Sequence, residues 1–237
     1  MRVTQEGYLH QLTWLPRLFP VNCYLIEEEQ ELTLIDAGMP FSTQGILRES
    51  ARLNKPLSRI VLTHAHADHV GALDKLKQLL PEAKVYISER DAALLAGDRS
   101  LRDGEPQLPI KGSVPAKVVT RPDILLYDGD TVGSLRAIST PGHTPGSMSF
   151  QDQRSGALIA GDAFQTFRGM AVAGKKVASF PFPAMATWSF GQALASAHKL
   201  IALAPSVLAA GHGDLVKNPV EIMKQAAAEA AKALGHH

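Results

Sequence analysis

The sequence predicts an α/β protein with the architecture of a four-layer αββα sandwich, and two observations lead to this fold class. Short apolar runs that are rich in β-branched residues alternate with segments whose apolar side chains recur at helical spacing. The alternation occurs in both halves of the chain, about residues 1–140 and 141–235, so each half predicts a sheet with helices on its outer face. We find no internal repeat and expect a single domain over residues 1–235.

The first half begins with strand signals and continues with alternating helices and strands. The expected strands lie at 3–9, 21–27, 32–35, 60–63, 84–87, 116–120, 124–127 and 131–139. The expected helices lie at 40–53, 69–80 and 89–96. Residues 97–115 are rich in Gly, Pro, Asp, Arg and Ser, so we expect a long surface loop that acts as a lid, as a binding loop or as a disordered segment.

The second half repeats the pattern of strands followed by helices. Its expected strands lie at 147–151, 157–160 and 206–210, and its expected helices at 188–203 and 219–234. The segment 163–187 is rich in Phe and Pro, and it is expected either in the core or in the wall of a substrate pocket. Residues 236–237 follow a glycine and are read as the remnant of a purification tag, so their histidines are left out of the site.

The composition excludes several classes of protein. A net charge of +1 without a basic cluster argues against a nucleic-acid surface. The apolar runs are too short for a membrane span, and no N-terminal signal is visible, so a cytoplasmic protein with a small-molecule substrate is expected. The single cysteine, Cys23, excludes an internal disulfide and is expected in the core. Monomer and homodimer are both left open.

A cluster of histidines marks the expected functional site. His64, His66, Asp68 and His69 lie within six residues, directly after the apolar strand at 60–63. Imidazole and carboxylate groups are the ligands of zinc and similar cations, whereas ordinary loop histidines would seldom crowd in this way. Because His64 and His66 alternate by two, they can point the same way, while Asp68 and His69 face a second point nearby. This one loop therefore offers ligands to two adjacent metals.

The pattern His64-x-His66-x-Asp68-His69 resembles the signature of the metallo-β-lactamase fold, a superfamily of mostly dinuclear metallohydrolases. Four further motifs extend the resemblance over residues 20–215 in the order expected of that family. They are Ile35-Asp36-Ala37-Gly38, the Gly/Pro loop that contains His143, Gly161-Asp162, and Gly211-His212-Gly213. An ordered set of this kind is far more specific than any one motif.

The resemblance implies a complete set of metal ligands. His64, His66 and His143 would bind one divalent cation, Asp68, His69 and His212 would bind the other, and Asp162 would bridge the two. Zinc is expected, with Mn, Fe and Co as alternatives. A hydroxide bridging the cations would then attack an ester, thioester, lactone or related bond, with Asp68 as a catalytic residue that orients it or carries a proton. Asp36 is expected to orient a ligand histidine rather than to bind metal.

Departures from known subfamilies narrow the expected activity. His69 stands where the β-lactamases with a Cys ligand have Arg, and the His-rich β-lactamases lack a residue equivalent to Asp162. Residues 163–170 lack the Gly-Cys-Gly element of glyoxalase II, Gln165 replaces the Tyr of the acyl-homoserine lactonases, and His66 replaces the Glu of the flavodiiron proteins. The resemblance therefore implies a hydrolase of the superfamily without an assigned substrate.

Two alternatives to the hydrolase are kept. The first is a mononuclear iron oxygenase similar to the persulfide dioxygenases, which would use only His64, His143 and Asp162 as ligands. The second is a metal-bearing binding protein without turnover. The full second set of ligand candidates favours the dinuclear hydrolase.

Overall fold

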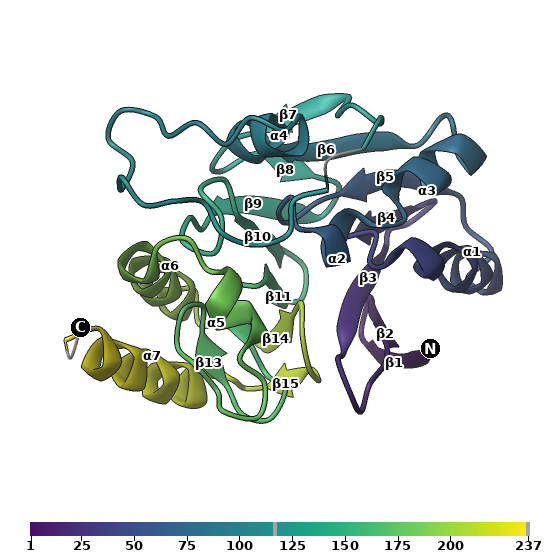
Figure 1. The fold of residues 1–237 in the computed structure, drawn as a ribbon. Coiled ribbons are helices and arrows are strands. Elements are labelled where there is room, and N and C mark those ends of the chain that lie inside the picture. Colours follow the sequence, from purple (N-terminus) through teal and green to yellow (C-terminus); the bar gives the residue numbers. More distant parts are fainter. Residues whose placement is uncertain (116–117, 236–237) are drawn as a thin grey trace.

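The computed structural model describes residues 1–115 and 118–235, whose strands form two large sheets stacked face to face (Figure 1). Helices cover the outer face of each sheet, so the four layers of the expected αββα sandwich are present. The predicted fold class is confirmed. The expected tag remnant at 236–237 and the first two residues of the expected strand 116–120 lie outside the described residues.

The first sheet contains seven of the described strands, in the order β1-β2-β3-β4-β5-β6-β7. These strands are Arg2–Glu6, Leu9–Trp14, Val21–Glu27, Leu32–Ile35, Leu57–Val61, Lys84–Ser88 and Ile124–Leu126. Strands β1 to β4 pair in antiparallel fashion, and β4 to β7 pair in parallel. The helical segments of this half are η1 (Pro40–Ser42), α1 (Thr43–Arg52), α2 (Ala67–Val70), α3 (Leu73–Leu79) and α4 (Glu89–Leu95).

The second sheet contains six described strands in the order β15-β14-β11-β10-β9-β8, in which only β11 and β14 pair in parallel. In chain order they are β8 (Thr131–Val132), β9 (Leu135–Ser139), β10 (Met148–Asp152), β11 (Leu158–Gly161), β14 (Val207–Ala210) and β15 (Val216–Lys217). Helices α6 (Phe190–Ala202) and α7 (Val220–Leu234) cover its outer face. A separate ribbon of β12 (Phe164–Gln165) and β13 (Ala171–Val172) precedes the short helix α5 (Phe182–Ala186).

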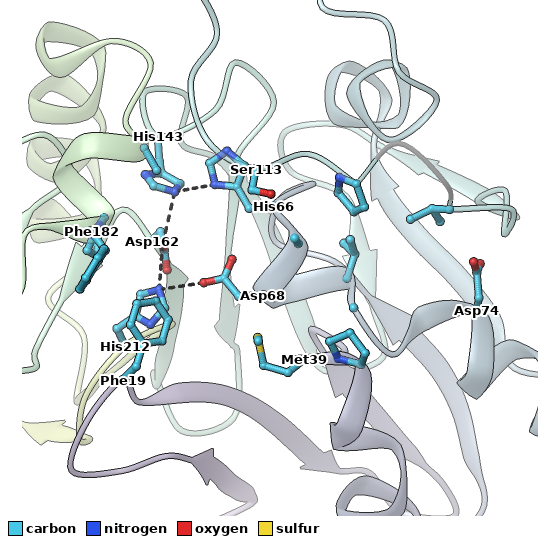
Figure 2. Close-up of a pocket in the computed structure, with 18 residues that line it drawn as sticks. Phe19, Met39, His66, Asp68, Asp74, Ser113, His143, Asp162, Phe182 and His212 are labelled. Atoms are coloured by element: carbon cyan, nitrogen blue, oxygen red, sulfur yellow. Dashed lines mark hydrogen bonds and ion pairs between the residues drawn. The ribbon is translucent and has the colours of Figure 1, made fainter.

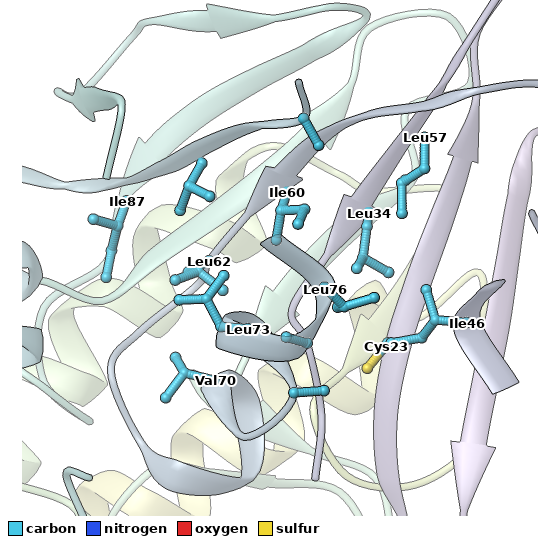
Figure 3. Close-up of a cluster of buried hydrophobic side chains, with 14 of the residues drawn as sticks. Cys23, Leu34, Ile46, Leu57, Ile60, Leu62, Val70, Leu73, Leu76 and Ile87 are labelled. Carbon is cyan, nitrogen blue, oxygen red and sulfur yellow. The ribbon is translucent and has the colours of Figure 1, made fainter. Parts of the chain in front are cut away.

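Alternation along the strands builds three apolar layers, because successive side chains of a strand point to opposite faces of the sheet. In β5, Ile60 belongs to the cluster packed against the helices, together with Leu76 of α3 (Figure 3), whereas Val61 faces the other sheet. In β11, Leu158 faces α6 and α7, whereas Ile159 joins the layer between the sheets. The core between the sheets therefore holds the two halves of the chain together.

The boundary between the halves differs from the expected one near residue 140. Strand β7 ends in the first sheet at Leu126, and β8 begins in the second sheet at Thr131. The expected single strand 131–139 is also wrong, because the chain turns at Gly133, where φ is +58°, and β9 pairs back on β8. Strand β9 then pairs with β10, so both belong to the second half.

Two strand predictions at other sites are also wrong. The chain turns at Gly7, where φ is +54°, so the expected strand 3–9 is divided between β1 and the unexpected strand β2. Strand β2 pairs with β1 and β3, and all six of its residues are buried. Because the buried residues include the polar His10 and Gln11, the segment shows no alternation of apolar and polar side chains. Residues 118–120 form no strand.

The expected helix 69–80 is two helices, α2 and α3. The chain passes so close to a neighbouring loop at Gly71 that its N–H donates to the carbonyl of Gly38 at 2.7 Å, and a Cβ there would lie 2.7 Å from the same oxygen. Strands β12, β13 and β15 and helix α5 were not expected. Residues 97–115 contain no helix or strand, as predicted. Among the described residues, no helix combines the length and the apolar character that crossing a bilayer requires.

Candidate metal centre

The seven expected ligands meet at one edge of the two sheets, where strands end. His64, His66, Asp68 and His69 follow β5, His143 follows β9, Asp162 follows β11, and His212 follows β14. Ligand sites commonly form beyond the carboxyl ends of strands in α/β folds. Six of these side chains are buried, and Asp68 is the partly exposed one, with 26% of its side chain accessible.

One group of candidate ligands consists of His64, His66 and His143, whose ring nitrogens lie within 4.8 Å of one another. Nδ1 of His66 lies 3.0 Å from Nε2 of His143, and the planes of the two rings are nearly perpendicular (Figure 2). Nε2 of His64 is buried and has no hydrogen-bond partner among the described residues. The three nitrogens thus converge on one point.

A second group consists of Asp68, His69 and His212, whose ligand atoms also lie within 4.8 Å of one another. Asp162 lies between the groups: its Oδ2 is 3.3 Å from Nε2 of His143 and 3.2 Å from Nε2 of His212, and its Oδ1 is 3.4 Å from Nε2 of His69. Ligand atoms of His64, His69 and Asp162 also lie within 4.8 Å of one another, so the two groups adjoin. The roles of the seven residues as ligands stay predictions.

The outward-facing nitrogens of three histidines contact groups that can only accept a hydrogen bond. His66 Nε2 lies 3.1 Å from the carbonyl of Lys111, and His212 Nδ1 lies 2.6 Å from the carbonyl of Pro20. His69 Nδ1 lies 2.8 Å from the carboxylate of Asp36. In each ring the proton therefore belongs on the outward nitrogen, and the neutral form directs a lone pair into the site.

Threonine hydroxyls fix the other two rings in the same way. Thr63 Oγ1 lies 3.0 Å from His64 Nδ1 and donates its own proton to Asp36. Thr187 Oγ1 lies 3.1 Å from His143 Nδ1 and donates its own proton to the carbonyl of Pro183 at 2.7 Å. Because both hydroxyl protons are used elsewhere, each hydroxyl accepts from the histidine, and again the inward nitrogen keeps its lone pair.

When all five rings are in the neutral form, the interior of the site is a set of acceptors without donors. Five imidazole lone pairs and two carboxylates converge, and the facing nitrogens of His66 and His143 repel unless a cation lies near both. His64 Nε2, His69 Nε2 and Asp162 Oδ1 are buried without hydrogen-bond partners in the described part of the chain. Buried polar atoms are seldom left unpaired, so these observations fit divalent cations held by nitrogen and oxygen ligands.

The pKa values of the buried histidines are shifted in opposite directions. Burial lowers the pKa of His143 to about 3 and that of His64 well below its usual value, so both rings are neutral. Burial is the largest influence on His69 and His212 as well and opposes their charge, but Asp162 together with the neighbouring carboxylates outweighs it and raises the pKa of both. His69 and His212 thus hold protons in the metal-free protein, and a bound cation would displace them.

Asp36 orients a ligand candidate, as the sequence predicted. One carboxylate oxygen accepts from the backbone N–H of Thr63, and the other accepts from the Thr63 hydroxyl and from His69 Nδ1, all at 2.8 Å. Donors occupy both oxygens of this buried carboxylate, and its contact with His69 is through Nδ1, so Asp36 is held as a partner of the ring.

Asp91 is a positioning residue that sequence reasoning missed. Its buried carboxylate accepts from the backbone of Ala65, between two ligand candidates, and from Thr144 and Gly146 on either side of the turn after His143. It therefore ties the two histidine-bearing loops together. Asp91 lies within the helix expected at 89–96, and the sequence contains no signal of its contacts with the two distant loops.

A cavity of about 630 Å³ opens beside the cluster, and Asp68, His66, His143, Asp162 and His212 line one end of it (Figure 2). The loop 97–115 contributes Ser113 and Pro115 to its wall. The aromatic segment 163–187 contributes both to the core and to the wall of the cavity. Phe164 and Phe180 are core residues, whereas Phe182 and Pro183 line the cavity.

The fold and the site together define a class: αββα proteins with a histidine- and aspartate-rich centre at one edge of the stacked sheets. A family model described as the metallo-beta-lactamase superfamily matches residues 16–212, and the chain belongs to that superfamily. The resemblance stated from the motifs is therefore confirmed.

Relatives in sequence and structure cover most of the chain. It is 58% identical over 232 residues to uncharacterized protein YobT of Bacillus subtilis (strain 168), which covers 98% of this chain and 100% of that protein. It is 30% identical over 214 residues to the probable metallo-hydrolase YflN of the same strain, covering 81% and 80% of the two chains. A crystal structure of TTHA1623 in a di-iron-bound form superposes with a TM-score of 0.65 and 27% identity, covering 89% of this chain and 96% of that one.

Proposed function

We propose that this protein is a metal-dependent hydrolase that cleaves an ester, thioester, lactone or related bond of a small molecule, with two divalent cations as cofactors. The observation that carries the proposal is the convergence of five imidazoles and two carboxylates, several of whose buried atoms have no hydrogen-bond partner among the described residues, at the end of a cavity. Similarity to YflN, named a probable metallo-hydrolase, supports it. Zinc is the expected metal, and the di-iron form of TTHA1623 makes iron the first alternative to test.

The residues divide into two ligand sets and one shared ligand. His64, His66 and His143 would hold one cation, and Asp68, His69 and His212 the other, with Asp162 between them. Divalent cations held there would lower the pKa of a water to about 7 and polarise a substrate oxygen.

Asp68 is the candidate for proton transfer. It lines the cavity, it is the most exposed of the seven residues, and its Oδ2 lies 3.5 Å from Nε2 of His212. A carboxylate at the boundary between buried ligands and the cavity is placed to take a proton from the attacking water and to deliver it to the leaving group. Asp36, Thr63 and Thr187 hold the rings of His69, His64 and His143 in the orientation that this requires.

Metal content separates the proposed hydrolase from the iron oxygenase. Elemental analysis of protein without any C-terminal tag should give close to two metal ions per chain, whereas one iron per chain would favour the oxygenase. His66→Ala should lose metal and hydrolytic activity, while an oxygenase that uses His64, His143 and Asp162 would keep its iron. The control is His198→Ala, at an exposed histidine of α6. Full hydrolytic turnover by His66→Ala would contradict the ligand assignment.

The remaining expectations from the sequence accompany the proposal. They are a cytoplasmic location, a single domain over residues 1–235, and a monomeric or homodimeric state without nucleic-acid or membrane partners. Gel filtration and light scattering of the purified chain would measure the oligomeric state.

A further inference from the structure

The cavity beside the candidate metal centre is large enough to select a substrate. Its volume of about 630 Å³ would hold on the order of twenty non-hydrogen atoms, if each takes roughly the 30 Å³ of a water molecule in the liquid. Pockets of this size bind most of the surface of a small organic ligand. The chemistry of the walls therefore bears on which molecule is cleaved.

Apolar side chains form the walls on both sides of the metal candidates. On one side lie Phe19 and Phe182, whose ring centroids are 5.2 Å apart, and the ring of Phe19 is 5.4 Å from that of His212. On the other side Met39 lies near Asp68 (Figure 2), and Val70 and Val118 also line the cavity.

The charged groups of the wall are already engaged. Asp74, which Figure 2 places away from the histidines, accepts the backbone N–H of Val119 at 3.1 Å and that of Thr120 at 2.8 Å. The other carboxylates, Asp68 and Asp162, belong to the candidate metal centre. Among the described residues that line the cavity there is no lysine or arginine.

These walls discriminate by charge and by polarity. A carboxylate or phosphate on the far end of a substrate would leave water without gaining a lysine or arginine partner among the described wall residues, and it would approach Asp74. An apolar chain, in contrast, gains about fourfold in binding for each methylene group that it buries. Selection of this kind requires no further polar contact.

We propose that the substrate is an uncharged ester or lactone whose acyl chain is apolar and lies along the wall formed by Met39, Val70 and Val118. The proposal rests on the proposed function. The reaction consumes one water: its oxygen forms a bond to the carbonyl carbon, the ester C–O bond breaks, the departing oxygen takes one of the water's protons, and the other proton is released to solvent as the acid ionises. The products are a carboxylate and an alcohol, or one hydroxy acid from a lactone, and nothing is oxidised or reduced.

A binding experiment tests the cavity independently of turnover. Methyl octanoate and monomethyl suberate have the same chain, but the second ends in a carboxylate. Displacement of the uncharged fluorophore Nile red from the protein, with and without added zinc, should show methyl octanoate binding at least tenfold more tightly. Equal or tighter binding of monomethyl suberate would overturn the proposal.

Measurements of turnover distinguish a failure of the apolar-substrate proposal from a failure of the proposed hydrolase. From methyl butyrate to methyl octanoate, kcat/KM of the zinc-loaded protein should rise about fourfold per methylene. A flat series, or faster hydrolysis of monomethyl suberate, would overturn the apolar substrate while leaving the hydrolase in place. Tight, selective binding of methyl octanoate without hydrolysis of any ester or lactone would instead reject the proposed hydrolase and keep the apolar ligand.

Two variants on helix α5 provide a matched comparison. Phe182 lines the cavity and is 52% exposed, while Met185 does not line it and is 62% exposed. Phe182→Arg places a cation at the wall, so it should shift the binding ratio at least tenfold toward monomethyl suberate. Met185→Arg adds the same charge outside the cavity and should leave the ratio unchanged. Equal shifts in both variants would show that net charge, rather than the cavity, sets the preference.

Discussion

Replacement of Asp36 by Asn tests whether outward partners control the protonation of the metal candidates. The carboxylate of Asp36 faces donors at both oxygens, namely the N–H of Thr63 at one and the Thr63 hydroxyl with His69 Nδ1–H at the other. An asparagine amide is nearly the same size, but one of its two ends donates. One of the two sets of donors must therefore face another donor.

The cost follows from the two orientations of the amide. With the NH₂ group toward His69, the ring has to accept at Nδ1, so its proton moves to Nε2 and the lone pair toward the site is lost. With the NH₂ group toward Thr63, a buried donor faces a donor, which costs about 1–3 kcal/mol. Loss of a partner that orients a ligand weakens metal binding by about 10–100-fold. We therefore expect Asp36→Asn to weaken one of the two metal sites by this factor.

The assay is a competition titration against a chromophoric zinc chelator, which resolves two successive affinities. Asp103→Asn, at an exposed aspartate, makes the same chemical change away from the site and should leave both affinities as they are. Circular dichroism reports whether the variant stays folded. Two affinities within a factor of two of the parent protein would refute the assignment of the His69 proton to Asp36.

Three further predictions concern the same region. Asp162→Ala should lose more metal on dialysis than Asp36→Ala, because Asp162 contacts both ligand groups; equal losses by elemental analysis would contradict this. Gly211→Ala places a Cβ 2.1 Å from Asp162 Oδ1 and should abolish metal binding in a folded protein, while Gly191→Ala, with nothing nearer than 4.0 Å, should not. Burial raises the pKa of Asp91 from 3.8 to about 6, so the folded protein holds this proton more tightly than the unfolded chain does. The resulting stabilisation of the fold is fully present below pH 3.8 and is lost as the pH rises through about 6. In urea titrations of metal-free protein, the unfolding free energy of Asp91→Asn relative to the parent should therefore rise by up to about 3 kcal/mol between pH 4 and pH 7, and a constant difference would contradict it.

Local sequence patterns were sufficient for the fold class, and the resemblance to the metallo-β-lactamase fold supplied the set of seven candidate ligands. Each of them follows an apolar strand or lies beside glycines, and those signals are contained in a few neighbouring residues. Strand β2 was not predicted because it is buried on both faces. Its sequence, which includes the polar His10 and Gln11, therefore lacks the alternation of apolar and polar residues that indicates a strand. The break at Gly71 depends on the approach of Gly38, more than thirty residues away in the sequence.

The outward partners of the histidines were beyond prediction for a different reason. His66 and His212 are held by the backbone carbonyls of Lys111 and Pro20, and a carbonyl is common to every residue type. Thr187 and His143 are far apart in the sequence and meet only when α5 packs beside the histidine loop. Asp36 was predicted because the family motif contains it.

The division of the candidate ligands between the two halves of the chain has a consequence for how metal would enter and leave. Four of them come from the first sheet and its loops, and His143, Asp162 and His212 come from the second. Cations at this edge would cross-link the sheets noncovalently, so part of the free energy of metal binding would oppose their separation. Release of metal would then require the sheet edges to part. Dissociation would be limited by that opening rather than by the strength of any one bond, and chelators would act slowly on the folded protein.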